Sequence, residues 1–508
     1  NPDFASWAVA GNQLTAGGTV GAVTFNVRPG TYTENVYIAN IPGNVASRPI
    51  IFQSENGNRN SVTLQFSNTA ASPISGTTSI GGTPTLRLNN ADFITFRNFT
   101  LTALNTAASS GVGVELIGAS GGSSGCDNVT FDNMAFNGVA STSFTLGDVF
   151  FLSVNSGSHP NLVINNCLFN QGSIPVYLVD VVSPLTTGIR ITNNSFENTG
   201  SYPMRLEGSD GAVVNNNSFS TSSAGLAAGI VFVNHNGAFS FRSNRVNFGI
   251  NNGVSAVVSG SRLATTQAVF ANNFIRIGGA NGIGFNASGS SATGCFHNTI
   301  LNATAGAAYA ATSGTSLSTV NNIFENIGGG PAFTGASGHA ANYNNYWSTG
   351  GTLTVWNGFG NTTLANHRMM SGQDANSSNV DVTFVDQLNN NLSLTLVDVN
   401  LYGIGSTSNG TFNSGIRGIV GDDIFGGTLN RSEVFMGAHQ LLPVISFNPA
   451  PPTTLNSCAN QTLTISGNAQ VTFGAQLSFS WQRNGAPLLD GVNGVSGAST
   501  GTLTVERG

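Results

Sequence analysis

A short motif recurs ten times between Asn98 and Asn344, and its period constrains the fold more than any other feature of the chain. Each copy reads apolar–x–apolar–x–Asn, with a large apolar residue three positions after the Asn, and successive copies lie 23 to 35 residues apart. A repeat of this length is typical of a solenoid in which each copy forms one coil. The alternation before each Asn indicates a strand with one buried face, so each coil of about three short strands predicts an all-β parallel β-helix.

The aligned Asn position predicts a ladder of side-chain amides. An amide carries both a donor and an acceptor, so Asn side chains stacked about 4.8 Å apart can hydrogen-bond from coil to coil. Asn also tolerates the left-handed conformation that a sharp turn requires. A leucine-rich repeat is the competing solenoid of this period, but its Leu-x-x-Leu-x-Leu motif is absent. The column contains Asn98, Asn133, Asn166, Asn193, Asn216, Ser243, Asn272, His297, Asn321 and Asn344.

The repeats divide the chain into segments. Residues 1–92 are expected to form an N-terminal cap, with a helix in Asp3–Leu14, and the first irregular coils. Residues 93–347 are the regular β-helix and 348–442 its last coils and closing segment. A Pro-rich linker at 443–452 leads to 453–508, which we expect to be a truncated immunoglobulin-like sandwich. Both ends of a solenoid expose sheet edges and therefore need covers.

Composition excludes several classes of function. All 16 basic residues are Arg, and with 22 carboxylates the net charge is −6, so no basic stripe is available for nucleic acid. No run of 18 apolar residues exists, so we expect no membrane insertion. The four Cys and six His are scattered without metal-ligand spacing, and no cofactor or metal is expected.

Two groups of acidic residues are candidates for chemistry. Glu197, Arg205, Glu207 and Asp210 lie within fourteen residues and could serve as acid, base and clamp at a glycosidic bond; the alternative is a surface ion pair worth less than about 1 kcal/mol. Asp127 and Asp132 flank one strand and could bind Ca²⁺, or they could be solvated turn residues.

Three further segments carry a resemblance: NVRPGTYTENVYI, SGQDANSSNVDVTFVD and GDDIFGG…R…MGAHQ. Over about residues 1–440 the chain resembles the large secreted right-handed β-helix surface proteins of Bacteroidota-type bacteria, which a type IX system exports. The resemblance implies a right-handed helix, an extracellular or cell-surface location, and a structural role for Asp422 and Asp423 against Arg431. Cys458 and Trp481 resemble the first Cys and the core Trp of an immunoglobulin-like domain, which implies that Cys458 pairs with a Cys beyond residue 508.

The sequence leaves three hypotheses for function. The first is a structural or adhesive surface protein, a rigid stalk in a longer multidomain or filamentous assembly, whose partners are other copies or domains of that assembly. The second is a β-helix that binds or degrades polysaccharide. The third is lateral self-association through flat polar faces. Clustered charged residues on one sheet face would favour the second, and uniform polar faces the third.

Overall fold

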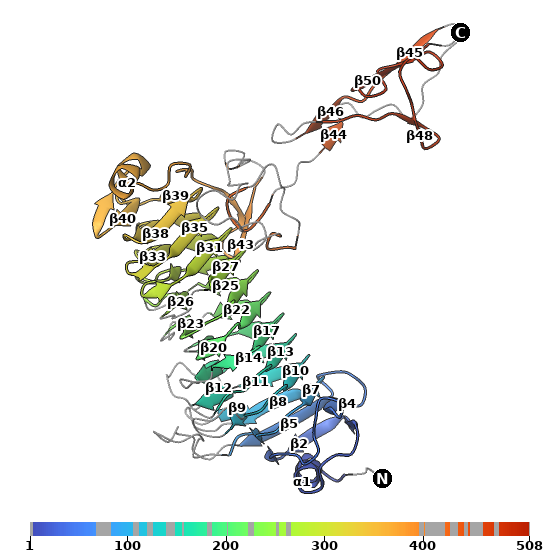
Figure 1. Cartoon of the computed structure of the whole chain (residues 1–508), viewed down its shortest axis with the longest axis vertical. Coiled ribbons are helices and arrows are strands. Elements are labelled where there is room, and N and C mark those ends of the chain that lie inside the picture. Colours follow the sequence, from blue (N-terminus) through green and yellow to red (C-terminus); the bar gives the residue numbers. More distant parts are fainter. Residues whose placement is uncertain are drawn as a thin grey trace. The chain divides into compact units, whose positions relative to one another are not determined.

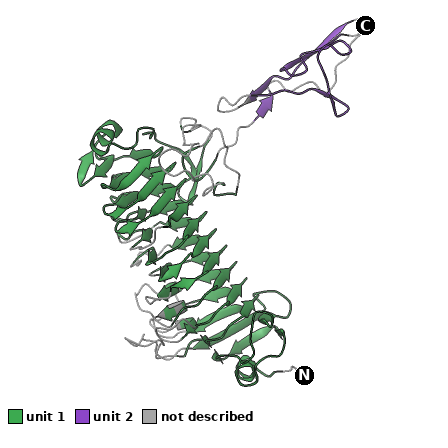
Figure 2. Ribbon diagram, viewed as in Figure 1, with its two compact units in different colours: residues 1–440 green, residues 441–508 purple. Residues whose placement is uncertain are grey.

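The computed structural model describes residues 4–67, 83–104, 111–118, 125–138, 148–154, 157–179, 185–200, 202–221, 228–249, 253–260, 266–395, 401, 422–426, 435–440, 445–447, 461–471 and 477–506. The chain forms two compact units, Asn1–Gln440 (unit 1) and Leu441–Gly508 (unit 2), as Figure 2 shows. The boundary lies beside the predicted Pro-rich linker.

Unit 1 is a right-handed parallel β-helix, which confirms the predicted fold class. Each coil contributes one strand to each of three long sheets, so each strand pairs side by side with the equivalent strand of the next coil (Figure 1). Sheet A contains twelve strands: β1 (Val23–Val27), β4 (Ile50–Ser54), β7 (Ile94–Arg97), β10 (Thr130–Asp132), β13 (Val163–Asn165), β17 (Arg190–Thr192), β21 (Val213–Asn215), β24 (Ser240–Arg242), β27 (Ala268–Ala271), β31 (Thr293–Phe296), β35 (Leu317–Val320) and β38 (His339–Asn342).

Sheet B follows sheet A in every coil. Its twelve strands are β2 (Gly30–Thr33), β5 (Val62–Ser67), β8 (Thr100–Leu104), β11 (Ala135–Asn137), β14 (Leu168–Asn170), β18 (Ser195–Glu197), β22 (Ser218–Thr221), β25 (Arg245–Phe248), β28 (Phe274–Ile277), β32 (Thr299–Asn302), β36 (Ile323–Asn326) and β39 (Asn345–Ser348).

Sheet C completes each coil. Its thirteen strands are β3 (Val36–Ile38), β6 (Leu86–Asn89), β9 (Gly111–Ile117), β12 (Asp148–Val154), β15 (Ile174–Val179), β19 (Met204–Glu207), β23 (Ile230–Val233), β26 (Val257–Ser259), β29 (Phe285–Asn286), β33 (Tyr309–Ala311), β37 (Phe333–Gly335), β40 (Thr354–Trp356) and the antiparallel β41 (Phe359–Asn361). Short strand pairs stand outside the three sheets: β16 (Thr186–Thr187) with β20 (Ser209–Asp210), β30 (Ser290–Ser291) with β34 (Gly314–Thr315), and β42 (Phe384–Asp386) with β43 (Asn391–Leu394).

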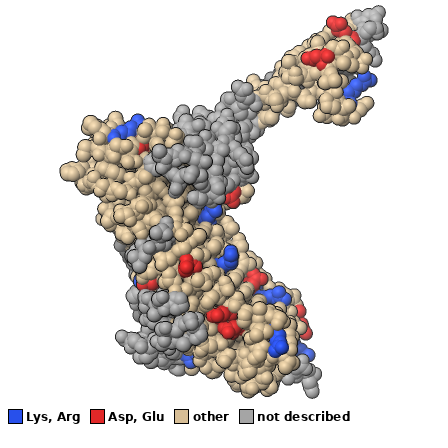
Figure 3. Space-filling view, in the orientation of Figure 1, with Lys and Arg blue, Asp and Glu red and all other residues tan. Residues whose placement is uncertain are grey.

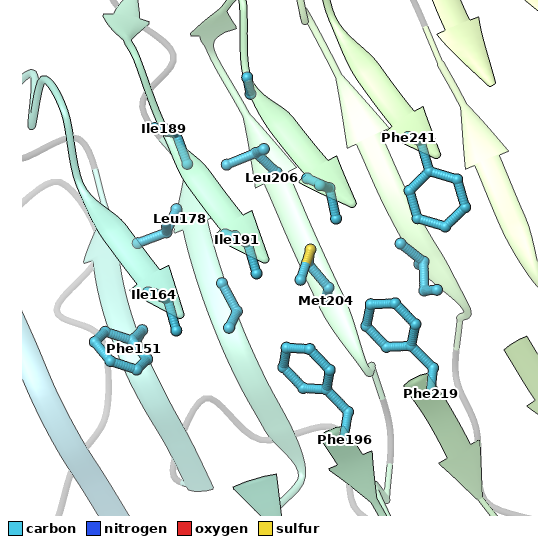
Figure 4. Close-up of a cluster of buried hydrophobic side chains, with 14 of the residues drawn as sticks. Phe151, Ile164, Leu178, Ile189, Ile191, Phe196, Met204, Leu206, Phe219 and Phe241 are labelled. Carbon is cyan, nitrogen blue, oxygen red and sulfur yellow. The ribbon is translucent and has the colours of Figure 1, made fainter. Parts of the chain in front are cut away.

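The core consists of columns of identical or similar side chains, because parallel in-register pairing places equivalent residues of successive coils one above the other. On sheet B, Phe136, Phe169, Phe196 and Phe219 stack with ring centroids 4.6–4.8 Å apart. In Figure 4 the Phe196 and Phe219 rings point toward apolar side chains of the facing sheets, including Met204. Every one of these side chains is fully buried, so the interior of the solenoid is apolar along the sheets.

Two Asn columns occupy the turn between sheets A and B. The predicted column supplies the left-handed turn: the residues from Asn98 to Asn321 all have positive φ. Some of its members hydrogen-bond on the surface, as Asn133 Nδ2 does to Asn98 Oδ1 at 2.8 Å. The continuous ladder lies in the next column, which points inward and comprises Asn194, Asn217, Asn244, Asn273, Asn298, Asn322 and Asn344.

The last repeat is displaced by one residue from the predicted alignment. Ile323 pairs with Asn345, so Tyr343 takes the left-handed turn position with a φ of 56°. Asn344 is therefore a rung of the buried ladder rather than a member of the turn column. Its backbone N–H donates to Ser377 Oγ at 2.9 Å, which ends the ladder.

Each end of the solenoid has its own cover. Helix α1 (Trp7–Gly17) packs on β3, and its N-terminus is capped by Ser6 and by the Glu34 carboxylate, which accepts from the N–H of Ala8 at 2.9 Å. At the other end, helix α2 (Leu364–Ser371) contributes His367, whose Nε2 lies 2.9 Å from Asp374 Oδ2; both side chains are fully buried.

The closing segment, residues 422–426 and 435–440, packs against several coils, from that of Arg242 to that of Asn321. Asp422 pairs with Arg242 at 3.5 Å, and Arg245 lies between the rings of Phe274 and Phe425 at 5.1 and 5.0 Å. Arg431, the expected partner of Asp422 and Asp423, lies outside the described residues. Their expected contact with Arg431 therefore stays a prediction. Asp423 also accepts from the backbone N–H groups of Phe425 and Gln440.

Unit 2 is described by itself as a set of short antiparallel strands: β44 (Ile445–Phe447) with β46 (Ala469–Val471), β45 (Thr462–Ser466) with β50 (Thr502–Glu506) and β49 (Val495–Ser496), and β47 (Gln482–Arg483) with β48 (Ala486–Pro487). Trp481 packs on a small core of Val495, Ala498 and Leu503. Cys458 lies outside the described residues, so its predicted disulfide stays a prediction.

Candidate functional site on the outer face of sheet C

The outer face of sheet C carries a partly buried cluster of Tyr177, Arg205 and Glu207. Strands β15 and β19 pair in parallel, and their register places Tyr177 directly beside Arg205. Along β19 the side chains alternate, with Met204 and Leu206 buried in the core and Arg205 and Glu207 partly exposed outside. The alternation of a strand with one buried face therefore puts the three polar side chains together on the outer surface.

An ion pair joins two members of this cluster. Arg205 Nη2 donates to Glu207 Oε2 at 2.8 Å, and the two side chains are 29% and 11% exposed. Burial alone would lower the pKa of Arg205, but its hydrogen bond to Glu207 and the nearby tyrosines raise that pKa overall. Because the pair is partly buried, salt screens it less than it screens a fully exposed ion pair.

The cluster keeps unused hydrogen-bonding capacity. Arg205 Nε is buried and has no acceptor among the described residues. Glu207 Oε1 receives only a long contact from Asn234 Nδ2, at 3.5 Å. The guanidinium lies 6.0 Å from the centre of the Tyr177 ring, and burial raises the pKa of the Tyr177 hydroxyl. A neutral phenol, a donor and a carboxylate oxygen thus meet at one place.

The other two members of the predicted constellation lie elsewhere. Glu197 is on β18 of sheet B, where Ser195 Oγ donates to its Oε1 at 2.9 Å. Asp210 is on β20, beside Asn236. The structure therefore joins Arg205 with Glu207 and places Glu197 and Asp210 on other strands. Tyr177 was not predicted, although the alternation in Ile174–Val179 marks it as the outward residue.

The predicted calcium ligands are also placed apart. Asp132 lies on β10, where its Oδ1 accepts from Asn165 Nδ2 at 2.8 Å. Asp127 instead lies next to Asp92, whose Oδ1 accepts from the Asp127 N–H at 2.8 Å. Burial, followed by the charge of Asp92, raises the pKa of Asp127 to about 6. Among the described residues, no group of three or more His, Cys, Asp or Glu side chains could hold a metal ion.

A second ion pair lies on the same outer face. Arg87 on β6 pairs with Glu115 on β9, and the Glu115 side chain is 2% exposed. On the described strands of sheet C, each Arg therefore has a Glu partner. On the face of unit 1 that Figure 3 displays, charged residues are scattered among other residues.

The cluster can bind a polar ligand more readily than it can cleave one. Cleavage of a glycosidic bond by the usual mechanisms needs two carboxyl groups on either side of the bond, at separations of about 5–10 Å. Of the four predicted residues, the cluster contains one carboxylate, Glu207, and that carboxylate is engaged by Arg205. A ring, hydrogen-bond donors and an acceptor suit recognition of hydroxyl groups.

Comparisons with known proteins add the following. No protein-family model and no curated protein sequence matches the chain. A mutant of the periplasmic alginate epimerase AlgG is 11% identical over 69% of this chain and 77% of its own, with a TM-score of 0.43. The Dettilon tailspike protein is 12% identical over 66% and 62%, with a TM-score of 0.39. The mannuronan C-5 epimerase AlgE4 A-module of Azotobacter vinelandii is 12% identical over 75% and 92%, with a TM-score of 0.35.

Identities and TM-scores this low support no statement about function, and the fold class follows from the strand topology of the chain itself. The described part of the chain contains no helix with the length and apolar character needed to cross a membrane.

Proposed function

We propose that the chain is an exported β-helix protein that binds a neutral polysaccharide on the outer face of sheet C. The observation that carries the proposal is the cluster of Tyr177, Arg205 and Glu207, in which an aromatic ring lies beside a partly exposed guanidinium–carboxylate pair. Aromatic rings pack against the C–H faces of sugars, and fixed polar groups orient the hydroxyls.

The charge of sheet C decides between neutral and acidic glycans. A polyuronate carries a negative charge on each residue and needs unpaired cations. Arg87 and Arg205 are both paired with Glu side chains, so the described face offers no net positive charge. A neutral glycan that hydrogen-bonds to Arg205 and Glu207 avoids this mismatch.

Binding to a panel of neutral and acidic oligosaccharides tests the proposal. We expect Tyr177→Ala to weaken binding about tenfold or more, which corresponds to about 1.4 kcal/mol. Tyr37→Ala is the matched control. Tyr37 lies on β3, at the first position of the outward-facing column of sheet C that also contains Tyr177, and it is 41% exposed. Equal losses in the two variants, or no binding to any oligosaccharide, would contradict the proposal.

The same panel separates binding from cleavage. A reducing-end assay is expected to show no shortening of a bound oligosaccharide. Shortening that is lost in Glu207→Gln would show instead that the site is catalytic, with Glu207 as its acid or base.

The second candidate function is a structural or adhesive stalk, favoured by the buried Asn ladder that runs without a break from Asn194 to Asn344. Its partners would be other copies or domains of the same surface assembly. Location at the cell surface and export by a type IX system, which rest on the sequence resemblance, stay predictions. Electron microscopy of native surface material would show repeating subunit contacts along a fibre if the stalk function holds.

A further inference from the structure

The C-terminal cover of unit 1 comprises α2 and the residues that follow it as far as Val380. Helix α2 packs on β40 at the end of the solenoid (Figure 1). Backbone hydrogen bonds attach the cover to the last coil. The N–H of Asp374 donates to Ala341 O at 2.9 Å, and the N–H of Tyr346 donates to Ser378 O at 3.0 Å. The cover therefore lies against the edges of β38 and β39, the last strands of sheets A and B.

Buried polar side chains meet between the cover and the last coils. In the cover, His367 Nε2 lies 2.9 Å from Asp374 Oδ2, and the hydroxyl of Tyr346 on β39 donates to Asp374 Oδ1 at 2.9 Å. On β38, His339 Nε2 lies 3.2 Å from Thr319 Oγ1, whereas His339 Nδ1 has no hydrogen-bond partner among the described residues. All of these side chains are buried, so His339 lies beneath the cover with one ring nitrogen unused.

The groups around His339 do not favour a positive charge on it. From the cover, Asp374 and His367 act on His339 electrostatically. On the same helix as His367, Arg368 carries a guanidinium that donates to Asp374 O at 2.8 Å. From the coils, the ring of Tyr309 lies 5.5 Å from the imidazole, and burial raises the pKa of its hydroxyl, so this group stays neutral. Asp374 is thus the carboxylate on which a proton at His339 would depend.

Asp374 is already engaged by other groups. Its Oδ1 accepts from Tyr346 and Ser377, and its Oδ2 lies against His367. Burial raises the pKa of the Tyr346 hydroxyl, which therefore stays a neutral donor. A buried charge without a partner of its own is strongly unfavourable. Burial accordingly lowers the pKa of His339 from 6.5 to about 4, a shift that Asp374 opposes and His367 increases.

The position of His339 decides which part of unit 1 responds to acid. His159 is also buried, but it hydrogen-bonds to Cys126 of the preceding coil and to Thr186 of the following one, so water reaches it after neighbouring coils separate. His339 lies on the last strand of sheet A, where separation of the cover alone exposes it to water. The end of a solenoid contacts one neighbour and opens at lower cost than the coils between the ends.

We propose that the C-terminal cover is released by acid: a proton on His339 makes the cover separate from the last coil while the coils themselves stay folded. Above pH 6.5 the histidine is neutral in both forms, and the closed form keeps its full stability. Below pH 6.5 a water-exposed histidine gains a proton that the buried His339 does not gain, so the open form is increasingly favoured. Release exposes the edges of β38 and β39, and unpaired edges are templates for another strand.

Hydrogen exchange of the full chain at pH 7 and pH 5, read by mass spectrometry as protection factors, tests the proposal. Each pH unit below 6.5 favours the open form about tenfold while the closed form stays unprotonated. We therefore expect the protection of residues 364–380 to fall about tenfold or more between the two pH values. Helix α1, the cover at the other end, contains no histidine and is expected to keep its protection.

Two variants identify the group that responds. His339→Gln keeps a polar side chain beside Thr319 and cannot gain a proton, so its cover is expected to be equally protected at both pH values. His159→Gln is the matched control, because burial also lowers the pKa of His159 to about 4, and its cover is expected to lose protection as in the unaltered chain. Circular dichroism and the melting temperature verify that both variants fold.

The unaltered chain keeps the test decisive even if a variant fails to fold. Equal protection of residues 364–380 at pH 7 and pH 5 would overturn the proposal. A loss of protection in α1 as large as that in the cover would also overturn it, because unit 1 would then be unfolding as a whole. An equal loss in the cover of His339→Gln would show that another group responds to acid, and the proposal would fail.

Discussion

Replacement of one rung of the buried ladder, Asn217→Ala, is expected to destabilise unit 1 strongly. The Asn217 side chain makes four hydrogen bonds in the interior. Its Oδ1 accepts from the backbone N–H and from Nδ2 of Asn194, both at 3.0 Å. Its Nδ2 donates to Ile191 O at 2.8 Å and to Asn244 Oδ1 at 3.1 Å.

The magnitude follows from the groups that lose their partners. Alanine leaves the buried N–H of Asn194 without this acceptor and Ile191 O without this donor, whereas Asn244 Oδ1 still accepts from the backbone N–H of residue 217. An unsatisfied buried polar group costs about 1–3 kcal/mol, so we expect the free energy of unfolding to fall by about 2–5 kcal/mol.

Urea denaturation followed by far-UV circular dichroism measures the effect, and Asn216→Gly is the control. Asn216 is exposed and has a φ of 58°, which glycine adopts freely, so this neighbouring change is expected to cost less than about 1 kcal/mol. If the two variants lose equal stability, or if Asn217→Ala loses less than Asn216→Gly, the buried column does not hold the coils together.

Two further variants test other parts of unit 1. Burial lowers the pKa of His159 from 6.5 to about 4, so the contribution of the neutral His159 to stability is complete above pH 6.5 and is lost as the pH falls toward 4. Between pH 7 and 5 the unaltered chain is therefore expected to lose about 2 kcal/mol more stability than His159→Gln. Equal dependence of stability on pH in the two proteins would contradict this. Arg245→Ala removes the guanidinium that lies between the rings of Phe274 and Phe425. These cation–π contacts contribute roughly 1–2 kcal/mol, so their loss is expected to speed hydrogen exchange in the closing segment. Arg276→Ala, at another partly buried arginine that donates to Asn247, should leave that exchange unchanged.

The solenoid could be predicted from the sequence because the strands and turns of each coil are specified by patterns within a few neighbouring residues. Alternation marks each strand, and Asn marks most of the left-handed turns, so the repeat from Asn98 to Asn321 was aligned correctly without any contact information. The ladder was assigned to the first Asn of each pair, however. A left-handed residue turns the chain, and the residue after it points inward, so the second Asn carries the buried bonds.

The final repeat shows where pattern matching fails. Its two consecutive Asn residues, Asn344 and Asn345, fit the motif in either of two registers. The structure selects the register in which Tyr343 makes the turn, and Tyr346 rather than Trp347 pairs beside Phe324. Packing of Tyr346 in the core and its bond to Asp374 at 2.9 Å favour this register, and neither is visible in the repeat itself.

The candidate site depended on contacts between coils. Arg205 and Glu207 were recognised because they are two residues apart on one strand, whereas Tyr177 belongs to the preceding coil. Glu197 seemed close in sequence but lies on a different sheet. The motif predicted a closing segment, but the pairing of Asp422 with Arg242 joins residues 180 positions apart, which no local pattern reveals.

The most direct test of polysaccharide binding compares a neutral and a uronate oligosaccharide of equal length, titrated calorimetrically at low and at high salt. Because both arginines on the described strands of sheet C are paired with glutamates, we expect the neutral glycan to bind with an affinity that salt hardly changes. Binding of the uronate alone, with an affinity that falls as salt rises, would contradict the account, as would the absence of binding to both.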